Sequence, residues 1–490
     1  MDRTITCFMP WSDTVSVASS VRALRGSGVV NSIFIVVPPE HTGDTGITEA
    51  QILRSAGFAS TDALKKMAAV TDTDFVLIYS KGFPLDPGRF AFERLIQVCE
   101  GTGAGMVYSD YFEKKSEKLS PHPLTDYQEG SLRDDFNFGS VILYSADAFR
   151  KACSAMKEDY SYAGLYDLRL KVSQSYPVVH IPEMLYTEVE TDTRRSGEKM
   201  FDYVDPRNRE VQVEMERACT DHLREVGAWL GPRFREIAFD DESFEYDASV
   251  IIPVRNRVKT IGDAIGSVLS QKSHYSFNLI IVDNHSTDGT TDVIRSFAGD
   301  KRVVHIIPER DDLGIGGCWN EALFSDKCGK FAIQLDSDDL YIDDTVVTRI
   351  VDAFHEQQCA MVVGSYRMVN FELKDIPPGL IDHREWTPEN GRNNALRING
   401  LGAPRAFYTP VLRTVRVPNV SYGEDYAVGL AISRNYRIGR IYEPLYLCRR
   451  WDENSDALLD VGKMNAHNLY KDRIRTIELL ARRRMISSAR

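Results

Sequence analysis

The segment FNLIIVDNHSTDGTTDVIRSF (277–297) contains the repeating unit of the fold. FNLIIVD is mostly apolar and predicts a buried strand, NHSTDG is a polar turn that contains a glycine, and TTDVIRSF predicts a helix. The same alternation continues outward from this segment, with further strands predicted at ASVIIPV (248–254), VVHII (303–307), FAIQLD (331–336) and AMVVGS (360–365). Strands that alternate with helices predict an α/β domain, in which helices flank a mostly parallel sheet.

Acidic residues crowd the end of one of these strands. QLDSDDLY (334–341) places Asp336, Asp338 and Asp339 within four positions, where like charges repel one another. In open α/β sheets, ligands bind beyond the carboxyl ends of the strands. Oxygen ligands separated by one residue suit Mg²⁺ or Mn²⁺, which keeps several waters and is completed by substrate phosphates. Short acidic triplets also occur in surface turns, so the hypothesis of a metal-diphosphate site depends on the position after an apolar strand.

The first half of the chain repeats this plan, as five pairs of segments indicate. The pairs are ITCFMPWSD (5–13) with SVIIPVRNR (249–257), DFVLIYSKGFPLDP (74–87) with KFAIQLDSDDLYID (330–343), AGMVYSDYF (104–112) with AMVVGSYRM (360–368), AGLYDLRLKVS (163–173) with GEDYAVGLAIS (423–433), and IPEMLYT (181–187) with IYEPLYL (441–447). The last two pairs share one offset of 260 residues, which favours a duplication over chance similarity between two α/β domains.

Two α/β domains in tandem are therefore predicted. The expected boundaries are a first domain at 1–205, a helical and acidic linker at 206–247, a second domain at 248–455 and a C-terminal basic helix at 456–490.

The two copies differ in their carboxylates. Residues 336–339 (DSDD) align with 80–83 (SKGF), and Glu424 and Asp425 align with Gly164 and Leu165. Solvated acidic turns would explain either cluster alone, but not the joint loss of both from the first copy. We therefore expect the second copy to perform chemistry and the first copy to be degenerate.

Together these segments resemble the family 2 glycosyltransferases, which are inverting enzymes of the GT-A fold. SVIIPVRNR, IIVDNHSTDGT (280–290), GIGGCWNEAL (314–323), QLDSDD and GEDYA occur in the order of the family motifs. The resemblance covers about residues 246–455. It implies two GT-A-like domains, of which the first lacks both the DxD motif and the base carboxylates.

The resemblance implies a role for each matched residue. Asp425 matches the catalytic base, Glu424 would orient the acceptor or the base, Asp338 is a metal ligand, and Asp336 lies near the metal or the ribose. Asp283 matches the aspartate that contacts the base or ribose, whereas Asp288 in the same turn has a helix cap as its alternative role. The implied contacts to the donor nucleotide are Pro253, Arg255, Asn256, Asp283, Ser286, Asn320, Asp336 and Ser337.

Some positions depart from the family pattern. Asp312 stands where the family often has asparagine, Trp319 where it often has arginine or lysine, and Trp451 near a position where histidine sometimes occurs. The third metal ligand is therefore unassigned, and Trp319 is expected to pack in the core rather than stack on a base. Candidates to neutralise the charge around Asp425 are Arg405, Arg449 and Arg450, although a solvated arginine cluster is an open alternative.

Composition limits the partners and the compartment. The 490 residues include 59 basic and 71 acidic ones, and the net charge of -12 argues against nucleic-acid binding. Eight scattered cysteines without a CxxC pair predict buried, reduced thiols. No leader pattern is evident, and no apolar run approaches the about 20 residues of a spanning helix, so a cytoplasmic protein is expected. Peripheral contact with the inner face of a membrane through the basic helix is left open.

The expected function is metal-dependent, inverting sugar transfer in polysaccharide or glycan assembly. The donor would be a nucleotide-diphosphate sugar with Mn²⁺ or Mg²⁺, a UDP-sugar being favoured over a GDP-sugar, and the acceptor a glycan or lipid-linked hydroxyl. The alternative is a non-catalytic scaffold that binds carbohydrate or nucleotide-sugar, which the retained carboxylates of the second copy disfavour. A nucleotidyltransferase is disfavoured because no glycine- and lysine-rich signature follows SVIIPV. A homo-oligomer formed through the first copy is also left open.

Overall fold

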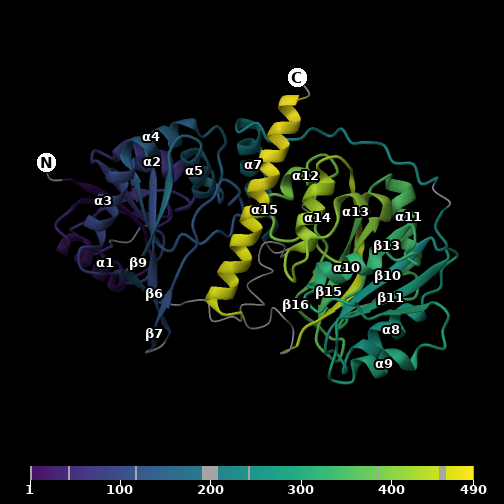
Figure 1. Cartoon of the computed structure of the whole chain (residues 1–490). Helices are drawn as coiled ribbons and strands as arrows, with labels where there is room; N and C mark the ends of the chain where they lie inside the picture. Colours follow the sequence, from purple (N-terminus) through teal and green to yellow (C-terminus); the bar gives the residue numbers. More distant parts are fainter. Residues whose placement is uncertain are drawn as a thin grey trace. The chain divides into compact units, whose positions relative to one another are not determined.

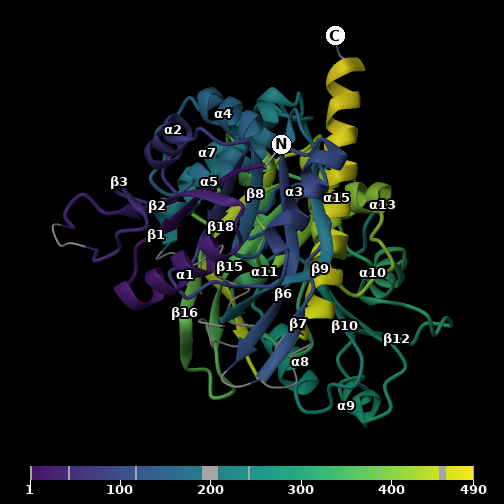
Figure 2. The same cartoon turned by 90° about the vertical axis from the view of Figure 1, so that its left-hand side faces the viewer.

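Two compact units make up the part of the chain that the computed structural model describes, which is residues 3–41, 45–115, 118–189, 208–240, 243–384, 386–451 and 459–488. The N-terminal unit comprises Met1–Arg194, Glu210–Ala228 and Leu459–Thr476, and the C-terminal unit comprises Arg195–Arg209, Trp229–Leu458 and Ile477–Arg490. Each unit contains one nine-stranded sheet with helices around it (Figures 1 and 2). The α/β class predicted from the alternating pattern is confirmed.

The sheet of the C-terminal unit has the order β12-β11-β10-β13-β17-β15-β18-β14, with β16 paired to β15. Its strands are β10 (Ala248–Val254), β11 (Phe277–Asp283), β12 (Val303–Ile306), β13 (Phe331–Gln334), β14 (Leu340–Tyr341), β15 (Met361–Val369), β16 (Asp375–Ile381), β17 (Arg405–Tyr408) and β18 (Ile438–Arg449). Its helices are α8 (Ile261–Leu269), α9 (Thr290–Ser296), α10 (Ile315–Leu323), α11 (Val346–Gln357), α12 (Gly391–Asn394), α13 (Thr409–Val415) and α14 (Glu424–Ser433).

The sheet of the N-terminal unit has the order β3-β2-β1-β4-β8-β6-β9-β5, with β7 paired to β6, which is the same order strand for strand. Its strands are β1 (Ile5–Pro10), β2 (Val30–Val37), β3 (Gln51–Arg54), β4 (Phe75–Tyr79), β5 (Asp86–Pro87), β6 (Met106–Lys115), β7 (Lys118–His122), β8 (Val141–Ser145) and β9 (Val178–Val189). Its helices are α1 (Thr14–Gly26), α2 (Thr61–Val70), α3 (Ala91–Thr102), α4 (Ala146–Ala155), α5 (Gly164–Ser173) and α7 (Arg209–Glu225).

Both sheets are mixed rather than mostly parallel. In the C-terminal unit, β10 pairs in parallel with β11 and β13, and β11 with β12. The other half of the sheet adds the short strand β17, which runs antiparallel to both β13 and β15. The sequence pattern did not indicate β17 because it has only four residues and follows a polar, glycine-containing segment. The parallel strand pairing expected from the sequence is therefore found in the first half of each sheet.

Strand register corrects two of the segment pairings between the copies. Ile5 of β1 is opposite Phe75 of β4, and Ala248 of β10 is opposite Phe331 of β13. Because Phe75 and Phe331 correspond in the two copies, Ile5 corresponds to Ala248. The sequence pairing had placed β1 one residue further along β10. Strands β6 and β15 are also displaced by one residue from the expected pairing, because β6 pairs with β8 one residue out of step with the way β15 pairs with β17 in that alignment. These strands are almost wholly buried, so a shift of one residue leaves an equally apolar alignment and the sequence does not reveal it.

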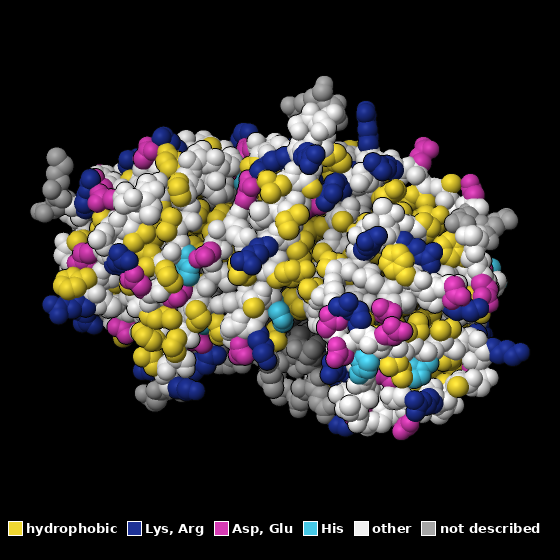
Figure 3. Space-filling view, viewed as in Figure 1, with side chains coloured by type: hydrophobic (Ala, Val, Ile, Leu, Met, Phe, Trp, Pro, Cys, Tyr) yellow, Lys and Arg dark blue, Asp and Glu magenta, His cyan; other side chains and the backbone are white. Residues whose placement is uncertain are grey.

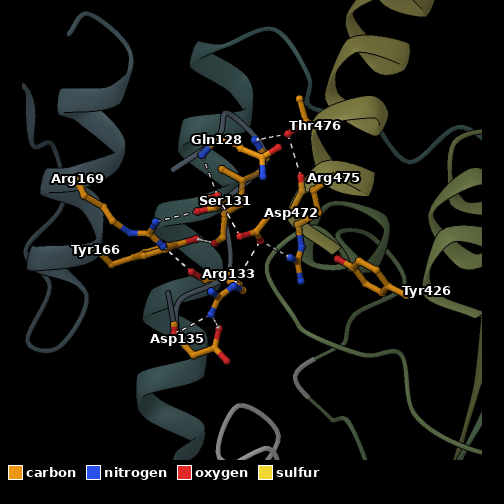
Figure 4. A network of polar contacts seen from close by, with 12 residues as sticks. Gln128, Ser131, Arg133, Asp135, Tyr166, Arg169, Tyr426, Asp472, Arg475 and Thr476 are labelled. Carbon is orange, nitrogen blue, oxygen red and sulfur yellow. Dashed lines mark hydrogen bonds and ion pairs between the residues drawn. The ribbon is translucent and has the colours of Figure 1, made fainter. Parts of the chain in front are cut away.

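The first half of helix α15 (Val461–Ser488) packs on the N-terminal unit through a buried polar network (Figure 4). Asp472 is fully buried; its Oδ1 accepts a hydrogen bond from Arg475 Nη1 at 2.8 Å, and its Oδ2 accepts one from Ser131 Oγ at 3.1 Å. Arg133 Nε lies 3.4 Å from the same carboxylate. A Cβ on Gly130 would lie 2.2 Å from the backbone nitrogen of Thr476, so the helix sits directly on that turn.

The second half of α15 belongs to the C-terminal unit, where Arg482 is fully buried. Arg482 Nε donates to Glu478 Oε1 at 2.8 Å, and its Nη2 donates to the carbonyl of Arg392 at 2.7 Å. Two arginines of the predicted basic helix, Arg475 and Arg482, are thus internal and paired with carboxylates. Other basic residues of the helix, such as Arg473 and Arg484, are exposed, and membrane contact through this helix stays a prediction.

No helix in the described ranges is long and apolar enough to cross a membrane. On the face shown in Figure 3, Lys and Arg side chains are interspersed with Asp and Glu. Seven cysteines, all except Cys448, are buried in the described structure, as the scattered cysteine pattern predicted.

Candidate active site

Two turns meet beyond the carboxyl ends of β10 and β11. Pro253 pairs with Val282 inside the sheet, and the exposed Arg255 and Asn256 follow in the turn. The backbone N–H of Asn256 donates to Ser286 Oγ at 3.0 Å, and its side-chain Oδ1 accepts from the N–H of Thr287 at 2.8 Å. The structure therefore brings Asn256 and Ser286 together, as expected if both face the same ligand.

Asp283 ends β11 and is fully buried. Its Oδ1 accepts from the N–H of Ser286 at 3.0 Å, its Oδ2 accepts from Thr291 Oγ1 at 2.6 Å, and His305 Nε2 lies 3.5 Å away. Burial opposes ionisation, but the hydrogen bonds from Ser286 and Thr291 prevail and lower the pKa of Asp283. Both oxygens accept hydrogen bonds from within the turn, and each retains a lone pair that could accept one more.

Asp288 connects the same two turns. Its Oδ2 accepts from the N–H of Val258 at 3.1 Å, and its Oδ1 accepts from the N–H and the hydroxyl of Thr290 at 3.0 and 2.6 Å. The structure therefore favours the local, helix-starting role of Asp288 over a ligand contact.

The glycine-rich segment acts through close packing. A Cβ on Gly316 would lie 1.8 Å from the carbonyl oxygen of Pro418, so only glycine fits against that chain segment. Asn320 Nδ2 donates to the carbonyl of Val417 at 2.7 Å, and its Oδ1 accepts from the N–H of Val417 at 3.1 Å. The Asn320 side chain, which the family resemblance assigns to the donor pocket, thus binds the backbone of the segment that leads into α14.

The acidic turn after β13 has one buried and two partly exposed carboxylates. Asp339 is buried and accepts from the N–H of Arg449 at 2.7 Å, and burial raises its pKa well above the usual range. Asp336 Oδ1 accepts from Gln334 Nε2 at 2.8 Å, and burial, followed by the charge of Asp338, raises its pKa. Ser337 is buried between the two predicted metal ligands, Asp336 and Asp338.

Asp338 faces cationic and polar groups. Its Oδ2 accepts from Trp451 Nε1 at 3.4 Å and lies 3.9 Å from Arg257 Nε. Within the described residues, no three His, Cys, Asp or Glu side chains are arranged to hold a metal ion. Two aspartates fit a hard cation that takes its remaining oxygen ligands from water and a diphosphate. They do not fit a cation held by protein alone.

The carboxylates of the GEDYA motif begin helix α14. Gly423 precedes the helix with a φ of +77°, and Glu424 and Asp425 occupy its first turn. Arg405 Nη1 lies 2.7 Å from Asp425 Oδ2 and also donates to the carbonyl of Gly402 at 2.7 Å. The arginine expected to neutralise the surroundings of the base therefore contacts it directly.

Gln334 links the two acidic clusters. Its Nε2 donates to Asp336, and its Oε1 accepts from the backbone N–H of Arg405 at 3.1 Å. A continuous path of short contacts therefore runs from Asp336 through Gln334 and Arg405 to Asp425. Sequence reasoning missed Gln334, although a polar residue inside the apolar strand FAIQLD was a visible signal.

Glu424 is a buried carboxyl next to Asp425. Burial, and next the charge of Asp425, raise the pKa of Glu424 to about 8. Its Oε2 is buried and has no hydrogen-bond partner among the described residues. Burial therefore favours the neutral form of Glu424, whereas Asp425 has the guanidinium of Arg405 beside it.

Replacing Glu424 by glutamine is expected to flatten the pH dependence of stability. Because the folded-state pKa is raised, the protonated carboxyl stabilises the fold below the ordinary carboxyl pKa, and this contribution is lost as pH rises towards about 8. Thermal unfolding midpoints at pH 6 to 9 should fall more steeply for the wild type than for Glu424→Gln. Parallel curves would contradict the raised pKa.

The remaining predicted residues lie in different surroundings. Trp319 is buried, and its ring centroid lies 5.9 Å from that of Phe407, so the expected core role is confirmed. Asp312 pairs with Arg310 in the exposed loop. Arg449 is buried rather than solvated, and its Nη1 donates to Asp263 Oδ2 at 2.8 Å. Residues 452–455 of the predicted post-base loop lie outside the described residues.

Comparison with known proteins places this site in a family. The sequence model of Glycosyl transferase family 2 matches residues 249–416. The chain is 32% identical over 186 residues to the glycosyltransferase TuaG of Bacillus subtilis (strain 168), whose name assigns it to teichuronic acid biosynthesis. This match covers 38% of the chain and 71% of TuaG. The chain belongs to glycosyl transferase family 2.

Other relatives of this family 2 glycosyltransferase carry more specific names. It is 28% identical over 201 residues to WfgD of Escherichia coli, named a UDP-Glc:alpha-D-GlcNAc-diphosphoundecaprenol beta-1,3-glucosyltransferase, and this match covers 40% of the chain and 74% of WfgD. Among solved structures, S. aureus TarS 1-349 in complex with UDP-GlcNAc matches 48% of the chain and 72% of its own, with 22% identity and a TM-score of 0.38. Glu424 and Asp425 lie beyond the residues that the family model matches.

Proposed function

We propose that the C-terminal unit transfers a sugar from a nucleotide-diphosphate sugar to an acceptor hydroxyl with inversion at the anomeric carbon. The observation that carries this proposal is the path from Asp336 through Gln334 and Arg405 to Asp425. The path joins the carboxylates that are suited to bind a cation to Asp425, the carboxylate that is suited to act as a base. An inverting transfer needs both around one sugar, on opposite sides of its reacting carbon.

Asp425 takes the role of the base in this proposal. It would accept the proton of the acceptor hydroxyl as the oxygen attacks the anomeric carbon. The contact with Arg405 favours the ionised carboxylate that this step requires. Glu424, whose pKa burial raises, would orient the acceptor or the base.

Asp336 and Asp338 would hold Mn²⁺ or Mg²⁺ together with the donor. Such an ion neutralises charge on the departing diphosphate when it is bound. Arg255, Asn256 and Ser286 would contact the nucleotide, because they share one turn region beyond the strand ends. A UDP-sugar is the favoured donor and a GDP-sugar the alternative.

The acceptor in this proposal is a glycan or a lipid-linked sugar of polysaccharide assembly, in the cytoplasm or at the inner face of the membrane. The names of TuaG and WfgD support polysaccharide assembly. The domain at 1–205 is proposed as a degenerate copy, because Ser80–Phe83 replace the acidic turn on the same strand order.

Calorimetric titration with UDP, GDP and CMP, each with Mn²⁺ and with EDTA, tests this proposal. One nucleotide should bind with Mn²⁺, and Asp338→Ala should weaken that binding by at least about tenfold. Loss of a residue that only hydrogen-bonds to a metal ligand already weakens metal binding by about that factor. Asp312→Ala is the matched control, because the Asp312 side chain is exposed and pairs with nearby Arg310. Binding that is equal with EDTA and in Asp338→Ala would contradict the metal role.

A non-catalytic scaffold is the second candidate function. It predicts nucleotide or sugar binding without transfer to any acceptor. The raised pKa of the buried Glu424 beside the arginine-paired Asp425 favours the enzyme, because perturbed carboxyl pKa values cluster at catalytic sites.

A further inference from the structure

The pairing of β13 with β17 in the C-terminal unit ends just before the candidate active site. Ile333 opposite Ala406 is the last pair of this antiparallel ladder in the described structure. Gln334 and Arg405 come next on the two strands. The backbone N–H of Arg405 donates to the side-chain Oε1 of Gln334 at 3.1 Å, while the backbone carbonyl of Gln334 accepts from Tyr341 OH at 3.0 Å. A side-chain amide therefore takes the place of a backbone group at this point of the sheet.

The N-terminal unit has an apolar pair at the equivalent place. Ile78 of β4 and Ile142 of β8, which occupy the positions of Gln334 and Arg405, are directly paired. The glycines three residues before Ile142 and Arg405 have φ values of +70° and +100°, which supports this alignment. Ile78 is 0% exposed and Gln334 is 3% exposed, so both side chains are interior. The fold can thus be built with isoleucine at this position, and it does not by itself require a buried amide.

The polar pair occurs in the unit that also has the carboxylates. Gln334 Nε2 donates to Asp336 Oδ1 at 2.8 Å. Arg405 Nη1 lies 2.7 Å from Asp425 Oδ2 and donates to the carbonyl of Gly402 at 2.7 Å, so the guanidinium is held from two directions. A single amide is therefore bonded on one side to a carboxylate proposed to bind the cation, and on the other side to the backbone of the arginine that contacts the proposed base.

We propose that Gln334 is a positioning residue for sugar transfer, an inference that rests on the proposed function. Its amide holds the carboxylate of Asp336 and the backbone of Arg405 in one arrangement, and Arg405 in turn holds Asp425. This one side chain therefore sets where the base lies relative to the carboxylates that hold the donor. Such placement matters because a displacement of about 1 Å between reacting groups can cost about 10²-fold in rate.

Gln334→Met tests this role, because methionine keeps the length of the side chain but has no donor and only a weak acceptor. The measured quantity is kcat for nucleotide release at saturating donor and Mn²⁺, and it should fall by about 10- to 100-fold. A residue that acted only through donor affinity would raise KM and leave kcat unchanged. The donors are UDP-glucose, UDP-N-acetylglucosamine and GDP-mannose, and the acceptors are water and a synthetic lipid-linked N-acetylglucosamine diphosphate.

Gln271→Met is the matched control for a merely structural effect. Gln271 is 5% exposed in the same unit, and its amide also bridges two segments of chain. Its Nε2 donates to the carbonyl of Asp343 at 2.6 Å, and its Oε1 accepts from the N–H of Val347 at 3.1 Å. Both variants lose the hydrogen bonds of a buried amide, so both should lower the thermal unfolding midpoint. Only Gln334→Met should lower kcat per folded molecule.

The outcomes separate this inference from the proposed function. Transfer by the wild type together with an unchanged kcat in Gln334→Met would overturn the inference and leave the transferase standing. A rise in KM alone, or an equal fall of kcat in Gln271→Met, would do the same. Absence of transfer by the wild type would overturn both. If Gln334→Met does not fold, Gln334→Glu replaces it: its carboxylate can still accept from the N–H of Arg405 but cannot donate to Asp336, and kcat should again fall.

Discussion

Replacing Asp425 by asparagine is expected to abolish sugar transfer, lowering kcat by about 10²- to 10⁴-fold, the contribution of a general base. Asparagine keeps the shape of the side chain but cannot take a proton from the acceptor. The change is local, because Asp425 sits in the first turn of α14 and contacts Arg405 from there. Release of the nucleotide product, measured with donor and acceptor present, gives kcat directly.

Nucleotide binding should remain near normal in Asp425→Asn, which separates loss of the base from loss of the donor site. Asp292→Asn serves as the matched control, since Asp292 is 82% exposed and pairs with Arg295 at 3.5 Å on helix α9. Transfer at the wild-type rate in Asp425→Asn would remove this residue from the base role. Loss of both transfer and nucleotide binding would indicate a structural effect instead.

Replacing Asp472 by alanine is expected to lower the free energy of unfolding by about 3–5 kcal/mol, the usual cost of removing one partner of a buried ion pair. Arg475 would keep its fully buried guanidinium without the carboxylate 2.8 Å away, and Arg133 would lose the same partner. Ser131 Oγ would lose its acceptor as well. Urea unfolding followed by circular dichroism measures the change.

Arg473→Ala on the same helix is the control, because position 473 is exposed and surface substitutions change stability by about 0.5 kcal/mol or less. Asp472→Asn should be milder than Asp472→Ala, since the amide oxygen still accepts a hydrogen bond. A loss below about 1 kcal/mol in Asp472→Ala would show that the network contributes little to stability.

The sequence predicted the strands of the parallel half and missed β5, β14 and β17. β10 and β11 are runs of apolar residues flanked by turns, and such runs carry a clear signal. β5 and β14 contain two residues each and β17 contains four, which is too short for any periodicity. The antiparallel half of each sheet depends on these pairings, so its direction could not be predicted.

The chemical type of a side chain in the site could be predicted from the sequence, whereas its orientation could not. The carboxylates of Asp336 and Asp425 are linked within one site, as the joint pattern predicted. Asp283 and Asn320 carry the expected groups, yet both use them on nearby backbone. Which way a polar side chain turns depends on neighbours that are distant in sequence, such as Val417 for Asn320.

The assignment of helix α15 to both units has a practical consequence for dissecting the protein. The N-terminal unit is assembled from three separate stretches of chain, and the last of them ends in the middle of this helix. No single cut in the gene can yield two complete fragments. A fragment that stops after β9 would lack Asp472 and leave the Gln128–Arg133 turn uncovered. Experiments that assign activities to the two units therefore need point substitutions in the intact chain, not separately expressed halves.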